Sequence, residues 1–217
     1  MSARLLEAKN LWLDYAGPRT SHALRGIDLA VESGSFVGVM GPSGAGKSSL
    51  LCVLAGLRQP SRGEVSFRGT PWPFPIGLGA DRRRVSIGFV FQEPFLVPHW
   101  TIAENLRVQQ FVPRRDRIEE LASRLGIARL LDEFPDRLSA GERQRASVAR
   151  ALVNDPLLIL ADEPTSCLDS ENGLNVMSLL TETLGRAALV VCTHDHRMLS
   201  GASRLFRMED GTLLGGD

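Results

Sequence analysis

Residues 41–48, GPSGAGKS, have the types and spacing that bind a phosphate chain, because they follow the pattern G-x-x-x-x-G-K-S/T. Glycines let backbone N–H groups curl around phosphate oxygens, and a helix beginning here adds the positive end of its dipole. Lys47 is expected to reach the β- and γ-phosphates, and Ser48 to ligate Mg²⁺. The alternative, a glycine-rich turn with a chance Lys-Ser pair, is disfavoured by the strand-like run before the motif and the helix-like run after it. The predicted phosphate-binding residues are Gly41, Pro42, Ser43, Gly44, Ala45, Gly46, Lys47, Ser48 and Ser49.

Two acidic residues follow the apolar run of the segment LLILADEP, residues 157–164. A buried strand there delivers Asp162 to its C-terminal edge, where ligands of open α/β sheets bind. Asp162 is expected to hold Mg²⁺, and Glu163 to orient and deprotonate an attacking water. An acidic pair after a strand can instead cap a helix, but the phosphate loop favours the catalytic interpretation. Together the two motifs indicate a nucleoside triphosphatase or a kinase.

Four continuous apolar runs, SFVGVM, VSIGFVFQ, LLILA and AALVVC, must position these groups. Such runs are typical of parallel strands whose sheet is covered on both faces. The first 30 residues hold shorter strand-like pieces broken by Gly and Pro. We therefore expect an α/β core with a small β-rich start and an all-helical insert over about residues 93–150. The Pro/Gly-rich residues 69–84 are expected to form an exposed connection.

Helix-start signals lie within the predicted insert. Thr101 with Glu104, and Asp116 with Glu119, have capping-box spacing, and Gly126 is expected to end the second helix. A third helix is expected from near Gly141 to about residue 153. Its predicted apolar face contains Ala146, Ala149, Leu152 and Val153.

Composition excludes several classes of protein. A chain of 217 residues fits one domain, and its formal net charge of zero argues against a nucleic-acid binder. The three cysteines, Cys52, Cys167 and Cys192, lack metal-ligand spacing and indicate reduced thiols. No signal-peptide pattern opens the chain, and no apolar run approaches the roughly 20 residues of a membrane span. We expect a soluble chain that reaches a membrane only through a partner.

Five segments stand in an order and spacing that resemble the ATP-binding-cassette (ABC) ATPases: GPSGAGKSSLLCVLAGL, VFQ, LSAGERQRASVARAL, LILADEPTSCLD and VCTHD. The resemblance covers nearly the whole chain and implies ATP and Mg²⁺ as ligands. It also implies one ABC ATPase domain over residues 1–217 with a RecA-like P-loop NTPase core, about 34–92 and 151–217. A small antiparallel β subdomain, about 1–33, and an inserted α-helical subdomain, about 93–150, complete the expected fold.

The resemblance gives residues 137–145, RLSAGERQR, a separate role. In that family the insert presents an LSGGQ-like loop across a head-to-tail homodimer, onto the γ-phosphate held by the other copy. Ser139, Ala140, Gly141 and Glu142 are then expected to complete a neighbour's ATP site. Ala140 stands where the family usually has Gly, and Glu142 where Gln is commoner. Ser139 is also a suitable N-cap for the helix that follows, and both roles can hold together.

Further positions carry over from the family one at a time. Tyr15 in LDYAGP matches the aromatic residue that stacks on adenine, although a core or turn tyrosine is an alternative. Gln92 matches a glutamine that contacts Mg²⁺ and senses the membrane partner. His194 in CTHD matches the histidine that holds the γ-phosphate and orients Glu163, and Asp169 matches a residue along the dimer seam. His22, His99 and His196 are expected at the surface.

The same resemblance implies that this chain lies on the cytoplasmic side of the inner membrane, bound peripherally through a separate transmembrane permease. Residues 93–106, EPFLVPHWTIAENL, lie where such a permease docks, with Phe95, Leu96, His99 and Trp100 as candidates for contact or for packing inside the insert. The C-terminal run VVCTHDHRMLSGASRLFRMEDGTL, residues 190–213, resembles the corresponding run of ATPases that export haem, glycolipid, macrolide or lipoprotein. The segment TSCLD, in contrast, departs from the pattern of the lipoprotein-releasing members. Export or extraction of a hydrophobic substrate such as haem, lipid or drug is the expected function, with no cargo contact by this chain.

The alternatives are a non-transport ABC ATPase acting as an ATP-switched dimerisation module, a GTPase and a small-molecule kinase. A GTPase needs an Asn-Lys-x-Asp run, which the sequence lacks. A kinase does not need LSAGERQR. Glu163 and His194 argue against a module that binds ATP without turnover.

Overall fold

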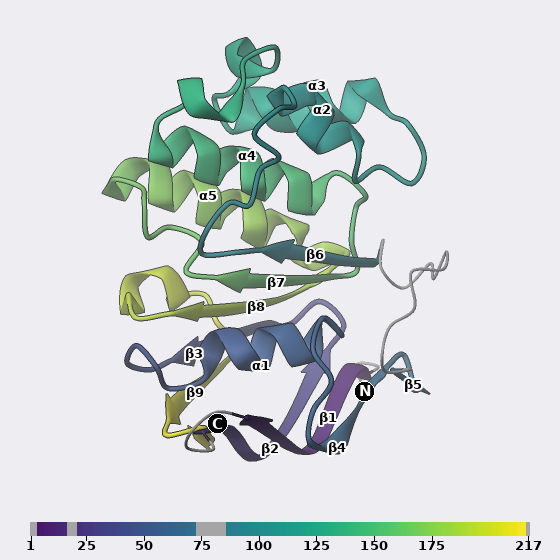
Figure 1. The fold of residues 1–217 in the computed structure, drawn as a ribbon, viewed down its shortest axis with the longest axis vertical. Helices are drawn as coiled ribbons and strands as arrows, with labels where there is room; N and C mark the ends of the chain where they lie inside the picture. The colour runs from purple at the N-terminus through teal and green to yellow at the C-terminus, as the bar shows by residue number, and fades with distance from the viewer. Residues whose placement is uncertain (1–3, 17–20, 73–85, 216–217) are drawn as a thin grey trace.

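The computed structural model describes residues 4–16, 21–72 and 86–215. They form two sheets with one helix, α1 (Lys47–Leu54), packed between them, and the other helices lie at the top of the view in Figure 1. Most of the connection expected at residues 69–84 lies outside the described residues. At its start, Thr70 and Pro71 are exposed as predicted. Trp72 is instead buried, stacked on Phe67 at a centroid distance of 5.6 Å.

The larger sheet has the strand order β10-β9-β3-β8-β7-β6. Its parallel strands are β3 (Phe36–Met40), β6 (Ile87–Val90), β7 (Leu158–Asp162), β8 (Ala188–Thr193) and β9 (Arg204–Glu209). The hairpin strand β10 (Thr212–Gly215) pairs antiparallel with β9. Because parallel strands share one direction, the carboxyl ends of β3 and β7 lie at the same edge of the sheet.

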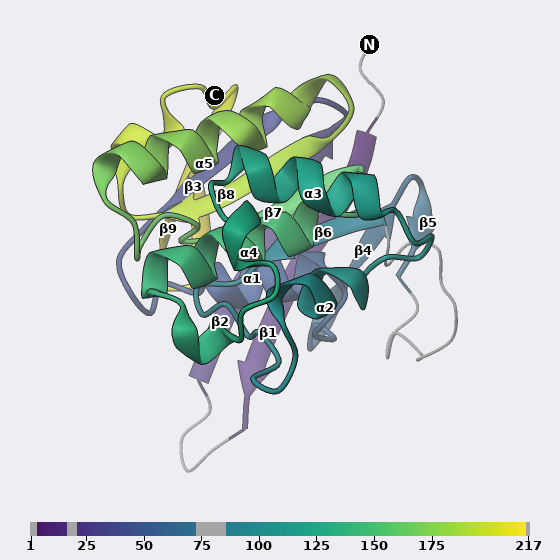
Figure 2. The ribbon, with the colours of Figure 1, turned by 90° about the horizontal axis from the view of Figure 1, so that it is seen from above.

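Both faces of this sheet are covered, which explains the continuous apolar runs. In β7, Leu158 and Leu160 pack in one apolar cluster with residues of α1 (Lys47–Leu54). Ile159 and Ala161 pack in a second cluster with residues of α4 (Ala140–Leu152) and α5 (Ser170–Glu182). Figure 2 shows α4 and α5 in front of the strands when the molecule is seen from above. Packing of the helices on both faces therefore fixes the position of β7 and of its last residue, Asp162.

The smaller sheet is antiparallel, in the order β2-β1-β4-β5. It contains β1 (Arg4–Tyr15), β2 (Ser21–Glu32), β4 (Arg62–Phe67) and β5 (Thr70–Pro71). The predicted β-rich part, about residues 1–33, contains only β1 and β2 of this sheet. Residues 62–71 complete it, because β1 pairs with β2 along one edge and leaves its second edge for β4.

The helical segment contains α2 (Ile102–Arg107), α3 (Arg115–Arg124) and α4, with the short 3₁₀ turns η2 (Ala128–Leu130) and η3 (Pro135–Arg137) between α3 and α4. The capping box of Thr101 and Glu104 is present in full, and Gly126 follows the end of α3 at φ 65°, as predicted. The prediction of a capping box at Asp116 is wrong. The residue before α3 is Arg114, which has an extended backbone, so the helix begins before Asp116. Arg114 Nη1 lies 2.9 Å from Asp155 Oδ2.

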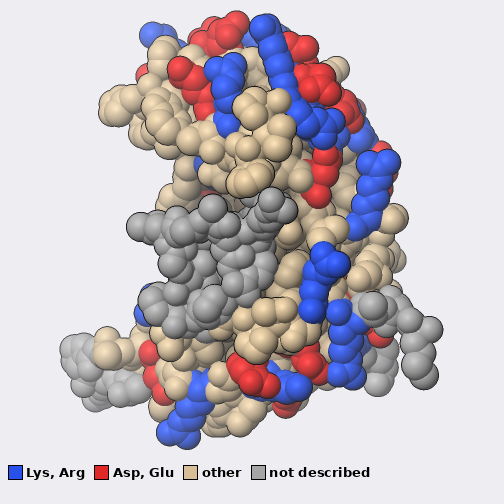
Figure 3. Space-filling view, turned by 90° about the vertical axis from the view of Figure 1, so that its right-hand side faces the viewer, with Lys and Arg blue, Asp and Glu red and all other residues tan. Residues whose placement is uncertain are grey.

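Arginine and acidic side chains stand side by side on the helical end of the face shown in Figure 3. Helix α3 carries an ion pair between such residues, Arg115 with Glu119 at 2.9 Å. This mixture differs from the single-sign basic stripe that nucleic-acid binding requires. In the part of the chain that the structure describes, no helix combines the length and hydrophobicity needed to span a bilayer.

Candidate nucleotide-binding and catalytic site

The phosphate loop, residues 41–48, joins the end of β3 to α1 and is held closely on both sides. A Cβ on Gly41 would lie 2.2 Å from the Met208 carbonyl oxygen, and a Cβ on Gly46 would lie 2.3 Å from that of Ala23. Gly46 also has φ 106°, a backbone conformation that favours glycine. These glycines are therefore required by close backbone approach and by the sharp entry into α1.

Lys47 is the first residue of α1, and its side chain is only 8% exposed. Its Nζ donates hydrogen bonds to the carbonyl oxygens of Gly41, at 2.7 Å, and Pro42, at 3.0 Å. The same Nζ lies 4.0 Å from Glu163 Oε1. The ammonium group is thus held under the loop and faces the acidic end of β7.

Asp162 ends β7 and is 5% exposed. Its carboxylate is hydrogen-bonded to the Ser48 side chain, and its Oδ1 has no hydrogen-bond partner among the described residues. Burial is the main reason that the pKa of Asp162 lies above its ordinary value, and the neighbouring Glu163 carboxylate adds to this. A buried, unpaired carboxylate oxygen beside a hydroxyl is the oxygen donor set that Mg²⁺ prefers, so these residues fit the ion.

Glu163 is 7% exposed and is fixed by three hydrogen bonds to its carboxylate. The backbone N–H of His194, at 3.1 Å, and its Nδ1, at 2.9 Å, contact Oε1, while Thr193 Oγ1 donates to Oε2 at 2.9 Å. Glu163 also has φ 46°, and its N–H bonds to the Cys192 carbonyl oxygen at 2.8 Å. Its backbone is therefore turned away from the strand path, so that the side chain enters the space above the phosphate loop.

These groups line one cavity of about 1020 Å³. It contains the predicted residues Tyr15, Ser43, Gly44, Gly46, Lys47, Ser48, Ser49, Gln92, Asp162, Glu163 and His194. The remaining loop residues, Gly41, Pro42 and Ala45, do not line the cavity, although the Gly41 and Pro42 carbonyl oxygens accept hydrogen bonds from Lys47. The structure therefore brings together predicted residues that lie up to 179 positions apart in the sequence, since Tyr15 and His194 share the cavity.

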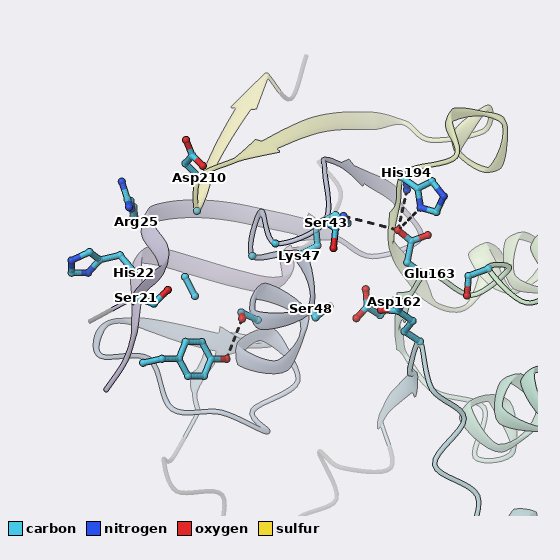
Figure 4. A pocket seen from close by; sticks show the side chains of 18 residues that line it. Ser21, His22, Arg25, Ser43, Lys47, Ser48, Asp162, Glu163, His194 and Asp210 are labelled. Carbon is cyan, nitrogen blue, oxygen red and sulfur yellow. Dashed lines mark hydrogen bonds and ion pairs between the residues drawn. The ribbon is translucent and has the colours of Figure 1, made fainter. Parts of the chain in front are cut away.

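The cavity also contains residues that the sequence analysis missed: Ser21, His22, Ala23, Arg25, Ser166, Asp210 and Gly211. In Figure 4, Ser21, His22, Arg25 and Asp210 lie on one side of the phosphate loop, opposite Glu163 and His194. His22 is exposed, as predicted, yet it lines the rim and its Nδ1 lies 2.6 Å from Asp14 Oδ1. Among these residues, Asp210 and Gly211 carried a sequence signal, because an Asp-Gly pair favours a turn; both have positive φ in the structure. Thr193, buried behind Glu163, carried none.

Tyr15 lies at the end of β1, and its hydroxyl is 3.1 Å from Ser49 Oγ. The Arg58 guanidinium lies over the Tyr15 ring, 4.4 Å from the ring centroid. The ring is thus attached to α1, and it is half-buried and packs against the edge of the apolar cluster that contains residues of β1 and α1. Tyr15 therefore lies at the boundary between the core and the cavity, so stacking on adenine stays a prediction.

The second predicted group, Ser139, Ala140, Gly141, Glu142 and Asp169, lies outside this cavity. Ser139 is the N-cap of α4 and forms a full capping box with Glu142. The hydrogen bond from the Ser139 backbone is the main reason that the pKa of Glu142 is lowered. A Cβ on Gly141 would lie 3.3 Å from the Cys167 carbonyl oxygen, and Asp169 is the N-cap of α5. The starts of α4 and α5 therefore meet around residues 167–169.

The segment after Gln92 is exposed but firmly held. Gln92 and His99 are exposed to solvent, and the exposed fractions of Phe95 and Trp100 are 64% and 38%. Arg150 of α4 donates to the carbonyl oxygens of Pro94, at 2.5 Å, and Phe95, at 2.7 Å. Leu96, in contrast, packs partly against the apolar cluster of the helical segment. A groove of about 590 Å³ lies beside this segment, and Leu57, Trp72, Phe89, Phe91, Phe95 and Arg150 are among its lining residues.

Comparison with known proteins places this geometry in context. A family model described as ABC transporter matches residues 24–166. An uncharacterised ABC transporter ATP-binding protein of Methanocaldococcus jannaschii is 38% identical over 97% of this chain and 98% of its own length. The lipoprotein-releasing system ATP-binding protein LolD of Shewanella frigidimarina is 37% identical over 91% of this chain and 86% of its own length.

Two further comparisons concern size and assembly. The pyoverdine export ATP-binding/permease protein PvdT of Pseudomonas fluorescens is 38% identical over 99% of this chain, which spans 34% of that protein's length. A solved dimeric ATP-binding cassette, captured after hydrolysis with ADP and Pi bound, superposes with a TM-score of 0.89. It is 33% identical, and 98% of each chain is covered.

Proposed function

The chain belongs to the ABC transporter family and is an ATP-binding ATPase of that family, and from this premise we propose that it powers an exporter-type membrane permease as a homodimer. The observation that carries the proposal is the arrangement of its two phosphate-facing groups. Glu163, His194 and Lys47 line one cavity, whereas Ser139 and its neighbours lie outside it. One copy thus holds a hydrolytic centre and presents an additional anion-binding helix start elsewhere.

In the proposed reaction, this chain first binds and orients the triphosphate. The backbone N–H groups of residues 44–49 face the phosphate oxygens, and Lys47 moves from the loop carbonyls to the phosphates. Ser48, Asp162 and Gln92 would hold Mg²⁺, which when bound neutralises charge on the phosphate oxygens. Tyr15 would stack on the adenine ring.

Glu163 then acts as the general base. Its carboxylate already accepts hydrogen bonds from Thr193 and His194, so the side chain is held in one orientation at the cavity surface. It would accept a proton from the water that attacks the γ-phosphate, while His194, largely exposed toward the cavity, contacts the γ-phosphate. Phosphoryl transfer of this kind depends on positioning and charge neutralisation more than on covalent help.

The second group completes the site of another copy. Ser139, Ala140 and Gly141 begin α4, and free N–H groups at a helix start attract anions. In a head-to-tail dimer these groups and Glu142 would face the γ-phosphate held by the other copy, with Asp169 along the seam. Two solved cassettes of similar structure are dimeric, which supports a dimer of this chain. Each site is then split between two chains, and hydrolysis releases them.

The groove beside Phe95 supports docking of a separate permease on the cytoplasmic side of the membrane. Its lining combines apolar residues with Gln59, Gln109, Arg150 and Asn154, which suits an amphipathic helix of a partner. Relatives named for export, PvdT and the macrolide export ATP-binding/permease protein MacB of Wolinella succinogenes, support an exporter. A hydrophobic substrate such as haem, a lipid or a drug would be carried by the permease, with no contact to this chain.

The test is the oligomeric state of the Glu163→Gln variant, measured by light scattering with and without ATP and Mg²⁺. We expect ATP to convert monomers into dimers, because binding persists while hydrolysis is blocked. Adding Ser139→Arg should prevent the shift by filling the helix start with a bulky cation. Ser123→Arg, at an exposed serine of α3, is the matched control and should leave it unchanged. A dimer that forms in spite of Ser139→Arg would refute the split site.

A further inference from the structure

Tyr15 is attached to α1 and to the segment that follows this helix. Its hydroxyl meets Ser49 Oγ at 3.1 Å in the first turn of that helix. Its ring lies under Arg58, whose guanidinium carbon is 4.4 Å from the ring centroid. Arg58 is itself held by α1, because its backbone N–H bonds to the Cys52 carbonyl oxygen at 3.1 Å. The aromatic ring is therefore fixed relative to the helix that carries the phosphate loop.

The Ser49 contact of Tyr15 lies at the cavity, and the Arg58 contact is made by a residue outside it. Tyr15 and Ser49 line the cavity, whereas Arg58 does not. Arg58 is exposed and lies beyond the last turn of α1. Tyr15 also packs partly against the apolar cluster, so the part of its ring that a ligand can reach is the part that lines the cavity. Nothing in the family pattern quoted above assigns a residue to this position.

We propose that Arg58 is a positioning residue for the nucleoside base: its guanidinium holds the Tyr15 ring so that the ring's free face meets a planar base. This inference rests on the proposed role of Tyr15 in ATP binding. A cation over an aromatic face is attracted to the negative charge of that face, which restricts the ring's motion. It also draws electron density from the opposite face, which favours stacking of an electron-rich base such as adenine. Ser49 belongs to α1, and Arg58 is tied to that helix by its N–H bond to the Cys52 carbonyl oxygen, so base and phosphates are held at a fixed separation.

The test separates base binding from phosphate binding. The affinities of ADP and of inorganic pyrophosphate, each with Mg²⁺, are measured by titration calorimetry for the wild-type chain and for Arg58→Gln. We expect ADP binding to weaken about two- to fivefold, the usual worth of an exposed cation–π contact, and pyrophosphate binding to stay unchanged. Arg58→Lys should retain part of the effect. In steady-state assays, Arg58→Gln should raise the KM for ATP by the same factor and leave kcat unchanged.

Two controls exclude simpler explanations. Arg62→Gln removes the same charge from an exposed arginine at the start of β4, outside the cavity, and should alter neither affinity. A purely electrostatic effect of Arg58 on phosphate would weaken ADP and pyrophosphate equally and would overturn the proposal. Tighter ADP binding by Arg58→Gln would also overturn it, because Arg58 would then be covering the face that the base needs.

The Tyr15→Ala variant distinguishes failure of this inference from failure of the proposed function. Loss of a stacked base should weaken ADP by about five- to 100-fold and leave pyrophosphate unchanged. If Tyr15→Ala has no effect on ADP, the proposed role of Tyr15 fails. If it weakens ADP and Arg58→Gln does not, the inference alone fails. In the Tyr15→Ala background, Arg58→Gln should have no further effect, since Arg58 acts through the ring.

Discussion

Replacing Asp162 by Asn should stabilise the metal-free protein while it abolishes magnesium-dependent hydrolysis. The Asp162 carboxylate is 5% exposed, and its Oδ1 has no hydrogen-bond partner among the described residues. The neighbouring Glu163 carboxylate adds repulsion. The residue is thus suited to its proposed metal and costs stability when the metal is absent. An Asn side chain keeps the shape and removes the charge.

The magnitude follows from the buried charge that Asn removes. Each unit by which the folded-state pKa exceeds that of the unfolded chain costs about 1.4 kcal/mol at neutral pH. For a chain of this length, each kcal/mol shifts the Tm by about 2–4 °C. We therefore expect the Tm of Asp162→Asn, measured with a chelator present, to exceed that of the wild type by several degrees at neutral pH.

The pH dependence gives the stricter test. The pKa of Asp162 in the folded protein is raised above the ordinary 3.8, mainly by burial, so the folded state binds this proton more tightly than the unfolded chain. Ionisation therefore destabilises the folded state as the pH rises above 3.8, and the penalty is complete above the raised pKa. The Tm difference between Asp162→Asn and wild type should be small at acid pH and grow toward neutral pH.

Thermal unfolding followed by circular dichroism, from below pH 3.8 to neutral pH, measures this difference. Glu64→Gln, at an exposed glutamate of β4 whose carboxylate is 4.0 Å from Lys9 Nζ, is the control and should show little change. A lower Tm for Asp162→Asn at neutral pH, or a difference that stays constant with pH, would refute the reasoning.

Three further outcomes are expected. Glu163→Gln should lower the ATP hydrolysis rate by about 10²–10⁴-fold, the usual worth of a general base, and near-normal turnover would remove Glu163 from that role. Gly46→Ala should abolish ATP binding and lower the Tm, because φ is 106° and the Ala23 carbonyl oxygen lies 2.3 Å from the added Cβ; an unchanged Tm would contradict this. Arg150→Gln should speed hydrogen exchange of residues 91–97, because two carbonyl oxygens lose their donor, and an unchanged exchange rate would show that Arg150 does not hold this segment.

Local patterns in the sequence predicted much of the fold. The run LLILA became the buried strand β7, because only a strand covered on both faces can be apolar at every position. The start of α4 followed from Ser139 and Glu142, because a capping box is made within four residues. The same logic failed at Asp116, where an ion pair between Arg114 and Asp155, 41 positions apart, accompanies an earlier start of the helix.

By itself, the sequence determined which residues could bind phosphate and act on it, because the motif GPSGAGKS and the pair Asp162-Glu163 are each contiguous. Only the tertiary structure decided what surrounds them. Thr193 bonds to Glu163, Arg58 lies over Tyr15, and residues 62–71 join the first sheet. Each of these contacts joins segments between 30 and about 60 positions apart. Such contacts depend on how strands pair and helices pack, which no local pattern of residue types records.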